Sequence, residues 1–264
     1  MKKVFTVVDE NNQAVRVLDG SHELSVFVRE CEGEGSEYFE ILDEKGVGTG
    51  ILKNRKQIHK QGDIHGAFHH FDVKRLDDGD ALIIFQKRNN KKDVNAGKMS
   101  GLVGGHFAFG ENFEDGVIRE IKEEVGVDVR FSDLTHLGAR KKISIQPAKD
   151  TVNREFQDVT ICITDRDYAD YSMQESELDA IIGIRARDLV DMFTEKTETV
   201  SGSGIEFVNG VVLPVSNATF ARGNFIVAPI TDNYYLKLAI FVLMHCNGES
   251  LPSDPFKTEV VYYL

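Results

Sequence analysis

The sequence has few cysteines, no long apolar run and no excess of positive charge. Its three cysteines, Cys31, Cys162 and Cys246, are widely spaced and include no Cys-x-x-Cys pair. An odd number of scattered cysteines predicts buried thiols in a reducing compartment rather than a disulfide framework. The longest apolar run, at residues 236–246, is too short to span a bilayer, and acidic residues near the start exclude a secretory signal. We therefore expect a cytoplasmic protein.

Positive charge is scarce: 31 Lys and Arg residues face 43 Asp and Glu residues, which gives a net charge of −12 over 264 residues. This excess opposes association with nucleic acid and with anionic membranes, so neither is an expected partner. Internal repeats and a basic recognition helix are also lacking. The hydrophobic share of 41% can furnish a sizeable core, which predicts one large domain or one domain with extensions.

Three segments are expected along the chain. Residues 1–36 are interpreted as an N-terminal β appendage, and residues 37–200 as the main domain. Residues 201–264 are interpreted as a C-terminal extension packed on the main domain. The run Ser201-Gly202-Ser203-Gly204 is typical of a flexible junction and marks the second boundary.

Short apolar runs separated by turn residues predict strands, and a few segments with helical periodicity predict helices. Asn209-Gly210 between two apolar runs indicates a hairpin, and residues 234–245 have the spacing of a helix. This mixture predicts an α/β fold with a mixed β-sheet covered by helices. The expected strands are residues 3–8, 14–18, 24–28, 67–73, 81–85 and 159–164.

Residues 105–127 gather acidic side chains around one short predicted helix. At about 100° of turn per residue, Glu120, Glu123 and Glu124 fall on one face, beside an apolar stripe that can pack on a core. Asn112 is the expected N-cap, and Gly126 is placed to end the helix. Taken alone, Glu-x-x-Glu-Glu is more typical of a solvated surface helix. Hard divalent cations prefer oxygen ligands, so the alternative is a site for Mg²⁺, or for Mn²⁺ in its place.

The spacing around this helix separates the two interpretations. Gly105, five residues, Glu111, seven residues and then Arg119-Glu120-apolar-x-Glu123-Glu124-x-Gly126-apolar resembles the signature of the Nudix hydrolases at every defined position. The resemblance implies an α/β/α sandwich and hydrolysis of a diphosphate linkage in a nucleoside diphosphate derivative or a related organic diphosphate. It also implies roles for the motif residues: Glu120, Glu123, Glu124 and the Gly105 carbonyl as metal ligands, Arg119 as the residue that orients a glutamate, and Glu111 as support from the loop.

Segments outside this motif resemble the Nudix subgroup similar to isopentenyl-diphosphate isomerase. The likeness covers about residues 38–195 and includes the segments 86–106 and 153–159. Isomerases of this type carry a catalytic cysteine where this chain has Gly104, and glycine cannot transfer a proton. Hydrolysis is therefore favoured over isomerisation. The alternatives are an isomerase-like enzyme and a non-catalytic Nudix-fold sensor whose ligand acts on the terminal extensions.

Several residues outside the motif are weaker candidates. Lys87 and Arg88 end a predicted strand and are candidates to hold substrate phosphate, against the alternative of solvated charges. Glu155 is the first candidate for a general base, and Glu177 and Glu175 are the second, although each is equally typical of a solvated surface.

By the isomerase resemblance, His59, His65 and His106 match positions near metal histidines and predict a second, transition-metal site. The alternative for them is ordinary hydrogen-bonded histidines. A homodimer is also considered, with the N-terminal appendage or the C-terminal hairpin as its contact.

Overall fold

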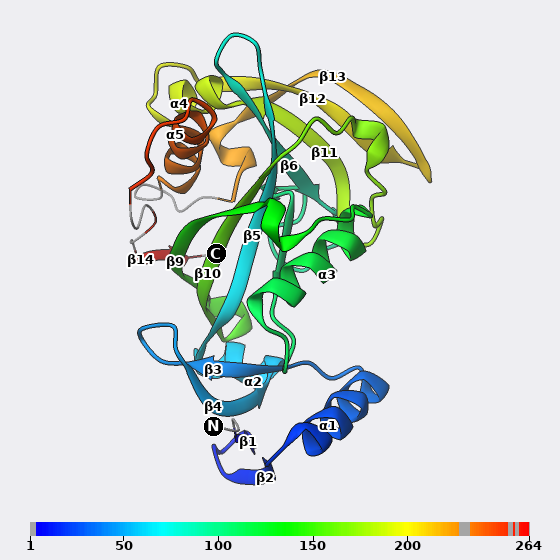
Figure 1. Ribbon diagram of the computed structural model, residues 1–264, viewed down its shortest axis with the longest axis vertical. Coiled ribbons are helices and arrows are strands. Elements are labelled where there is room, and N and C mark those ends of the chain that lie inside the picture. The colour runs from blue at the N-terminus through cyan, green and yellow to red at the C-terminus, as the bar shows by residue number, and fades with distance from the viewer. Residues whose placement is uncertain (1–3, 227–232, 253–255, 257–258, 264) are drawn as a thin grey trace.

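The computed structural model describes residues 4–226, 233–252, 256 and 259–263, and in this part of the chain it contains two mixed β-sheets and five α-helices (Figure 1). The helices are α1 (Ser21–Glu34), α2 (Arg55–Gln61), α3 (Phe113–Val125), α4 (Ala186–Phe193) and α5 (Tyr234–Cys246). The smaller sheet contains β1 (Phe5–Val8), β2 (Ala14–Leu18), β3 (Tyr38–Leu42) and β4 (Gly48–Asn54). The larger sheet contains β5 (Ile64–Arg75), β6 (Ala81–Arg88), β7 (Met99–Gly101), β8 (Val103–His106), β9 (Leu134–Gln146), β10 (Thr151–Ile163), β11 (Leu178–Arg185), β12 (Thr199–Val208), β13 (Val211–Ala221) and β14 (Glu259–Tyr263).

The larger sheet has the order β13-β12-β11-β6-β5-β10-β9-β14, with β7 paired to β6 and β8 paired to β5. The pairs β5–β10 and β9–β14 are parallel, and the others are antiparallel. Helix α3 packs on one face, while α4 and α5 pack on the other, so two hydrophobic cores lie on opposite sides of the sheet (Figure 1). The expected α/β fold with a mixed sheet is confirmed. Within the described residues, no helix combines the length and the apolar character needed to cross a membrane.

The smaller sheet has the order β2-β1-β4-β3 and is covered by α1. The expected strands at residues 3–8 and 14–18 correspond to β1 and β2, although residue 3 lies outside the described residues. The strand expected at residues 24–28 is wrong, because this segment is the middle of α1. Its apolar side chains recur at helical spacing and pack on the sheet; they are Leu24, Phe27, Val28 and Cys31.

Strand pairing crosses both of the expected segment boundaries. Strand β1 pairs with β4 across residue 36, and β11 pairs with β12 across residue 200. A division at either position would separate hydrogen-bonded strands. The division into residues 1–36, 37–200 and 201–264 stays a prediction, and these pairings argue against its boundaries.

The glycine run Ser201–Gly204 lies inside β12 and is not a flexible junction. A Cβ atom on Gly204 would lie 1.9 Å from the carbonyl oxygen of Ile181, and one on Gly202 would lie 2.6 Å from Cγ2 of Ile182. The glycines are needed because β12 approaches β11 too closely for side chains at these positions. The expected hairpin is confirmed, since Asn209 and Gly210 both have positive φ values, 52° and 81°, in the turn between β12 and β13.

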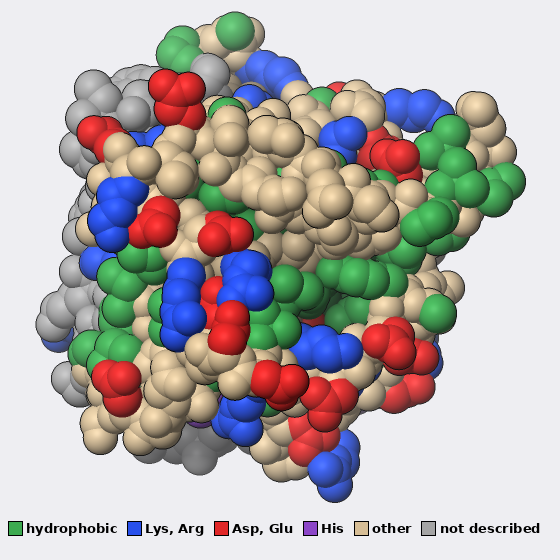
Figure 2. Space-filling view, turned by 90° about the horizontal axis from the view of Figure 1, so that it is seen from above, with side chains coloured by type: hydrophobic (Ala, Val, Ile, Leu, Met, Phe, Trp, Pro, Cys, Tyr) green, Lys and Arg blue, Asp and Glu red, His purple; other side chains and the backbone are tan. Residues whose placement is uncertain are grey.

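The β12–β13 hairpin extends from the body of the protein and has an apolar end. Val211, Val212 and Leu213 are 55%, 46% and 42% exposed. Figure 2 shows hydrophobic side chains gathered on the projection at the right of the view, the side on which Figure 1 has the end of this hairpin. This surface is available for contact with another protein chain.

Candidate functional site

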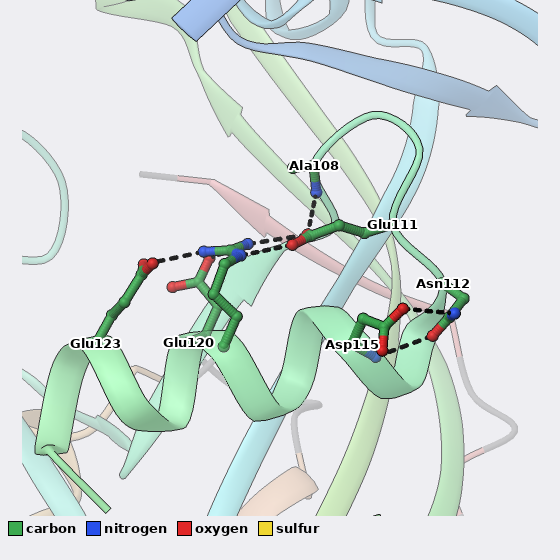
Figure 3. Close-up of polar contacts among 7 residues, drawn as sticks. Ala108, Glu111, Asn112, Asp115, Glu120 and Glu123 are labelled. Atoms are coloured by element: carbon green, nitrogen blue, oxygen red, sulfur yellow. Dashed lines mark hydrogen bonds and ion pairs between the residues drawn. The ribbon is translucent and has the colours of Figure 1, made fainter. Parts of the chain in front are cut away.

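Helix α3 begins and ends where the sequence predicts. The Asn112 side chain accepts a hydrogen bond from the backbone N–H of Asp115 at 2.9 Å and donates one to the Asp115 carboxylate at 2.8 Å (Figure 3). Gly126 has a φ of 72° and ends the helix in the left-handed conformation. The buried apolar face consists of Val117, Ile121 and Val125. This packing fixes the opposite, acidic face relative to the sheet.

Arg119 connects three carboxylates of the motif (Figure 3). Its guanidinium donates two hydrogen bonds to Glu111, at 2.5 and 2.9 Å. It also donates to Glu120 at 3.1 Å and to Glu123 at 3.0 Å. The hydrogen bonds to Glu111 are the largest cause of a raised pKa for Arg119, which therefore stays charged. The structure thus brings together four of the residues that the sequence assigned to this site.

Glu120 and Glu124 carry negative charge that the protein compensates poorly. Burial raises the pKa of Glu120 even though Arg119 is adjacent. Glu124 is only 6% exposed, and burial, followed by the charges of Glu120 and Glu177, raises its pKa well above the usual range. Its carboxylate accepts one long hydrogen bond, 3.5 Å, from the Gln86 side chain, and no Lys or Arg of the described residues lies within ion-pair distance. The charges of Arg88 and Lys92 act on Glu124 in the opposite direction but do not outweigh burial. A buried carboxylate that no cation contacts directly fits a metal ligand better than a solvated surface residue.

Gly105 lies directly against this carboxylate group. A Cβ atom at this position would lie 2.9 Å from Cδ of Glu120. The missing side chain therefore lets the backbone of β8 approach the acidic face of α3, as a backbone ligand would require. Glu123, at the exposed end of the group, stays accessible to solvent.

The two basic residues at the end of β6 face opposite sides of the sheet. Gln86 contacts Glu124 on the α3 side, and Arg88 shares that side because strand side chains alternate. The Nε atom of Arg88 is buried and has no hydrogen-bond partner among the described residues. Lys87 alternates to the side of Phe85, which belongs to the core under α5. The structure brings Arg88 to the acidic group and leaves Lys87 on the other face.

Three histidines from different elements meet on that other face. His59 in α2, His65 in β5 and His106 in β8 have ligand nitrogens that all lie within 4.8 Å of one another. Their Nε2 atoms are buried and, within the described part of the chain, have no hydrogen-bond partner. Burial lowers the pKa of His59 to about 4 and that of His65 to about 3, so both are neutral at physiological pH. Buried ring nitrogens that converge in this way without hydrogen-bond partners in the described part of the chain suit a metal better than the hydrogen-bonded alternative does.

Glu155 lies beside these histidines and not beside the carboxylates of α3. Its Oε1 atom is 3.6 Å from Nε2 of His106, and it accepts hydrogen bonds from Asn153 at 2.6 Å and from Lys142 at 3.1 Å. Burial opposes its ionisation, but the Lys142 charge and His106 outweigh burial and hold the pKa of Glu155 well below its usual range. Alternation along β10 puts Glu155 on the same side as the buried core residue Val159, away from α3.

The other two base candidates differ in their surroundings. Glu177 forms an ion pair with Lys92 at 2.5 Å, and its charge is one cause of the raised pKa of Glu124. Glu175 is exposed, and only its backbone carbonyl is used, as acceptor for Asn89. Glu177 is therefore the base candidate that lies on the α3 side, close to the acidic group.

Sequence reasoning missed Gln86 and Asn153. Each lies two residues before a charged candidate, Gln86 before Arg88 and Asn153 before Glu155. In a strand this spacing puts both residues on one face, so period-two counting from the candidates could have found them.

Comparison with known proteins agrees with the geometry of α3. The NUDIX domain family model matches residues 69–195. A protein of Clostridium acetobutylicum named an uncharacterized Nudix hydrolase is 32% identical over 168 residues, which span 64% of this chain and 79% of that protein. The chain belongs to the Nudix hydrolase family.

Two further similarities are more distant. Nudix hydrolase 3 of Arabidopsis thaliana is 28% identical over 123 residues, which cover 47% of this Nudix hydrolase and 16% of the Arabidopsis protein. A solved structure from Deinococcus radiodurans has 15% sequence identity and a TM-score of 0.45, covering 60% of this chain and 90% of that one. Family membership makes the protein a hydrolase of diphosphate-containing substrates. These matches give no support to the isomerase-like subgroup, which stays a prediction.

Proposed function

We propose that this Nudix hydrolase uses Mg²⁺, or Mn²⁺ in its place, to cleave a diphosphate linkage in a nucleoside diphosphate derivative or a related organic diphosphate. The observation that carries the proposal is the burial of Glu124 next to Glu120, with no Lys or Arg of the described residues in direct ion-pair contact with Glu124. Hard oxygen ligands of this kind, open to solvent at Glu123, are those that Mg²⁺ takes together with substrate phosphates.

In this proposal the metal ligands are the side chains of Glu120, Glu123 and Glu124 together with the carbonyl of Gly105. Bound there, a divalent ion would neutralise phosphate charge and polarise the attacking water. Arg119 keeps Glu120 and Glu123 in one orientation, and the paired hydrogen bonds to Glu111 keep Arg119 in place. Positioned carboxylates lower the reorganisation needed when the transition state forms.

Arg88 is the proposed phosphate-binding residue. Its position on the α3 side supports this role, as does its Nε, which has no hydrogen-bond partner within the described chain, because a guanidinium binds phosphate oxygens with several donors. The position of Lys87 on the opposite face argues against its assignment to the same phosphate.

We propose Glu177 as the general base that takes the proton from the attacking water. Changing Glu177 to Gln should lower kcat by roughly 10²-fold or more with little change in KM, since general-base catalysis contributes on that scale. The matched control is Glu175→Gln, an exposed residue two positions earlier, which should keep the activity of the unmodified protein. Steady-state kinetics decides the assignment: full activity in Glu177→Gln contradicts it.

The function itself is tested by a screen of nucleoside diphosphate derivatives and other organic diphosphates with Mg²⁺ or Mn²⁺, with products read by mass. Cleavage into two phosphate-bearing products is the expected result. If no diphosphate compound is cleaved with either ion, the proposed reaction is wrong.

The three histidines and Glu155 are proposed as a second metal site on the other face of the sheet. Three imidazole nitrogens and one carboxylate form a donor set typical of transition metals rather than Mg²⁺. In this arrangement Glu155 is a ligand, and its strongly held negative charge suits that role better than proton abstraction.

Metal analysis tests this second site. After dialysis, the protein should retain one transition-metal ion per chain, and His65→Asn should release it because a ligand is lost. The control is His136→Asn, since His136 lies half exposed and contacts Asp158 at 2.7 Å. Equal metal content in the two variants would contradict the site.

Neither alternative function is favoured. An isomerase of the expected subgroup needs a cysteine at position 104, where a Cβ atom would lie 2.9 Å from Cδ2 of His69. A cysteine there would require His69 to move. The relatives named as hydrolases argue against a non-catalytic sensor.

A homodimer and a cytoplasmic location stay predictions. The apolar end of the β12–β13 hairpin supports the first, because exposed apolar patches are common at subunit contacts. The three scattered thiols support the second.

A further inference from the structure

One loop connects the two candidate metal sites. It leaves β8 at His106, which belongs to the histidine group, and reaches Glu111, which holds Arg119. Two phenylalanines in this loop enter different cores. Phe107 packs in the core under α3, with ring centroids 5.7 Å from Phe68 and 5.6 Å from Phe113.

Phe109 instead enters the core of the small N-terminal sheet. Its ring is 5.0 Å from Phe5 and 5.8 Å from Phe27, and the residue is 9% exposed. All other described members of this hydrophobic cluster come from residues 5–52. In Figure 1 the loop between β8 and α3 descends from the large sheet to β3 and β4 at its lower end.

The turn around Phe109 sets the position of Glu111. The backbone N–H of Ala108 donates to the Glu111 carboxylate at 2.9 Å, and the backbone N–H of Glu111 donates to the Ala108 carbonyl at 3.0 Å (Figure 3). Gly110 completes the turn with a φ of 87°, which glycine adopts without strain. Phe109 therefore lies at the tip of a turn whose end carries the carboxylate that holds Arg119.

We propose that Phe109 is a positioning residue for the carboxylates of α3. Its ring is held in a hydrophobic socket formed by the N-terminal sheet and α1, which includes Phe5 and Phe27. Burial of its ring fixes the turn, the turn fixes Glu111, and Glu111 holds the guanidinium that orients Glu120 and Glu123. The inference rests on the proposed function of those carboxylates. In this proposal the N-terminal sheet affects the reaction through its contact with Phe109.

Two variants disturb the turn by different routes. Phe109→Ala removes the anchoring ring. Gly110→Ala strains the backbone while adding a methyl group to open space, because no atom of the described residues lies within 4 Å of a Cβ at this position. Phe109→Leu keeps an apolar side chain in the socket. Leu18→Ala is the control, since Leu18 is fully buried in the same cluster but belongs to β2.

The experiment measures Mg²⁺ binding from the rise of Tm with Mg²⁺ concentration, together with kcat and KM. Phe109→Ala and Gly110→Ala should each weaken Mg²⁺ binding or lower kcat roughly 10-fold to 100-fold, as expected when the support of a metal ligand is lost. Phe109→Leu should recover most of that loss. Leu18→Ala should lower Tm and leave Mg²⁺ binding unchanged.

Normal Mg²⁺ binding and kcat in Gly110→Ala and in every folded Phe109 variant would overturn the inference, as would an equal loss in Leu18→Ala. If the unmodified protein cleaves no diphosphate, the proposed function fails. The Mg²⁺ dependence of Tm still decides the role of Phe109 in that case.

Discussion

Changing Glu124 to Gln should remove most of the hydrolytic activity and also stabilise the metal-free protein. The activity falls, by roughly 10²-fold or more, because one proposed metal ligand loses its charge. The stability rises because burial, followed by the charges of Glu120 and Glu177, raises the pKa of Glu124 well above its usual range, so its ionised form is poorly compensated. The neutral isostere removes that penalty. A gain of about 1 kcal/mol corresponds to a rise in Tm of about 2–4 °C for a chain of this size.

The two effects are measured separately, with Tm determined in a chelator and kcat determined with saturating Mg²⁺. Glu114→Gln is the matched control, because Glu114 lies exposed in the first turn of the same helix. It should change neither quantity appreciably. A Glu124→Gln variant that keeps full activity, or that melts below the unmodified protein in chelator, contradicts this account of Glu124.

Changing Asp72 to Ala should lower the free energy of unfolding by about 3 kcal/mol, which is the scale of a broken buried ion pair. Asp72 is almost fully buried and accepts hydrogen bonds from Arg166 at 2.8 Å and from the Tyr171 hydroxyl at 2.7 Å. His70 contacts its other oxygen at 3.2 Å. The variant leaves these donors without an acceptor in a region that water enters poorly.

The loss should also depend on pH. Burial alone raises the pKa of Asp72, but the hydrogen bonds from His70 and Tyr171 and the charge of Arg166 outweigh burial and lower it below 3.8. The folded state therefore binds this proton less readily than the unfolded state. The stabilisation is present in full above pH 3.8 and is lost as pH falls through the folded pKa.

Urea unfolding at neutral pH and at several values below pH 3.8 measures this difference. The gap between the unmodified protein and Asp72→Ala should narrow as pH falls. The control is Asp128→Ala, because Asp128 is an exposed residue paired with Lys122. A gap that is the same at every pH would mean that Asp72 acts through packing and not through its charge.

Helix α3 could be predicted in detail because its determinants are local. The Asn112 cap, the Gly126 end and the shared face of Glu120, Glu123 and Glu124 depend only on spacing along one helix. The same is true of the turn at Asn209-Gly210. The sequence alone therefore predicts the acidic face of the site.

The N-terminal helix and the glycine run were misread because their determinants are tertiary. Leu24–Val28 is a short apolar run that fits a strand as well as a helix, and only the packing of Phe27 against Phe5 and Phe109 separates the two. Gly202 and Gly204 resemble a linker in composition. Glycine is required at both positions because β11, a strand about twenty residues earlier in the chain, approaches them closely.

Which face of the sheet each candidate occupies could not be predicted without the strand register. Lys87 and Arg88 are neighbours in sequence and lie on opposite faces, as do Gly105 and His106. A shift of one residue in register would exchange them. This alternation is why Glu155, a first candidate for the base, lies with the histidines, while Glu177 lies with Glu124.

Strand β14 bears on the aggregation of incomplete chains. It pairs in parallel with β9 and covers that edge of the large sheet, with Glu259 opposite Lys141 and Tyr263 opposite Ile145. A chain that stops before residue 259 would leave residues 141–145 of β9 without this partner, so the longer strand β9 would become the edge of the sheet. Unpaired edge strands recruit strands from other molecules. Nascent chains on the ribosome and truncated expression products should therefore aggregate more readily than chains that include this strand.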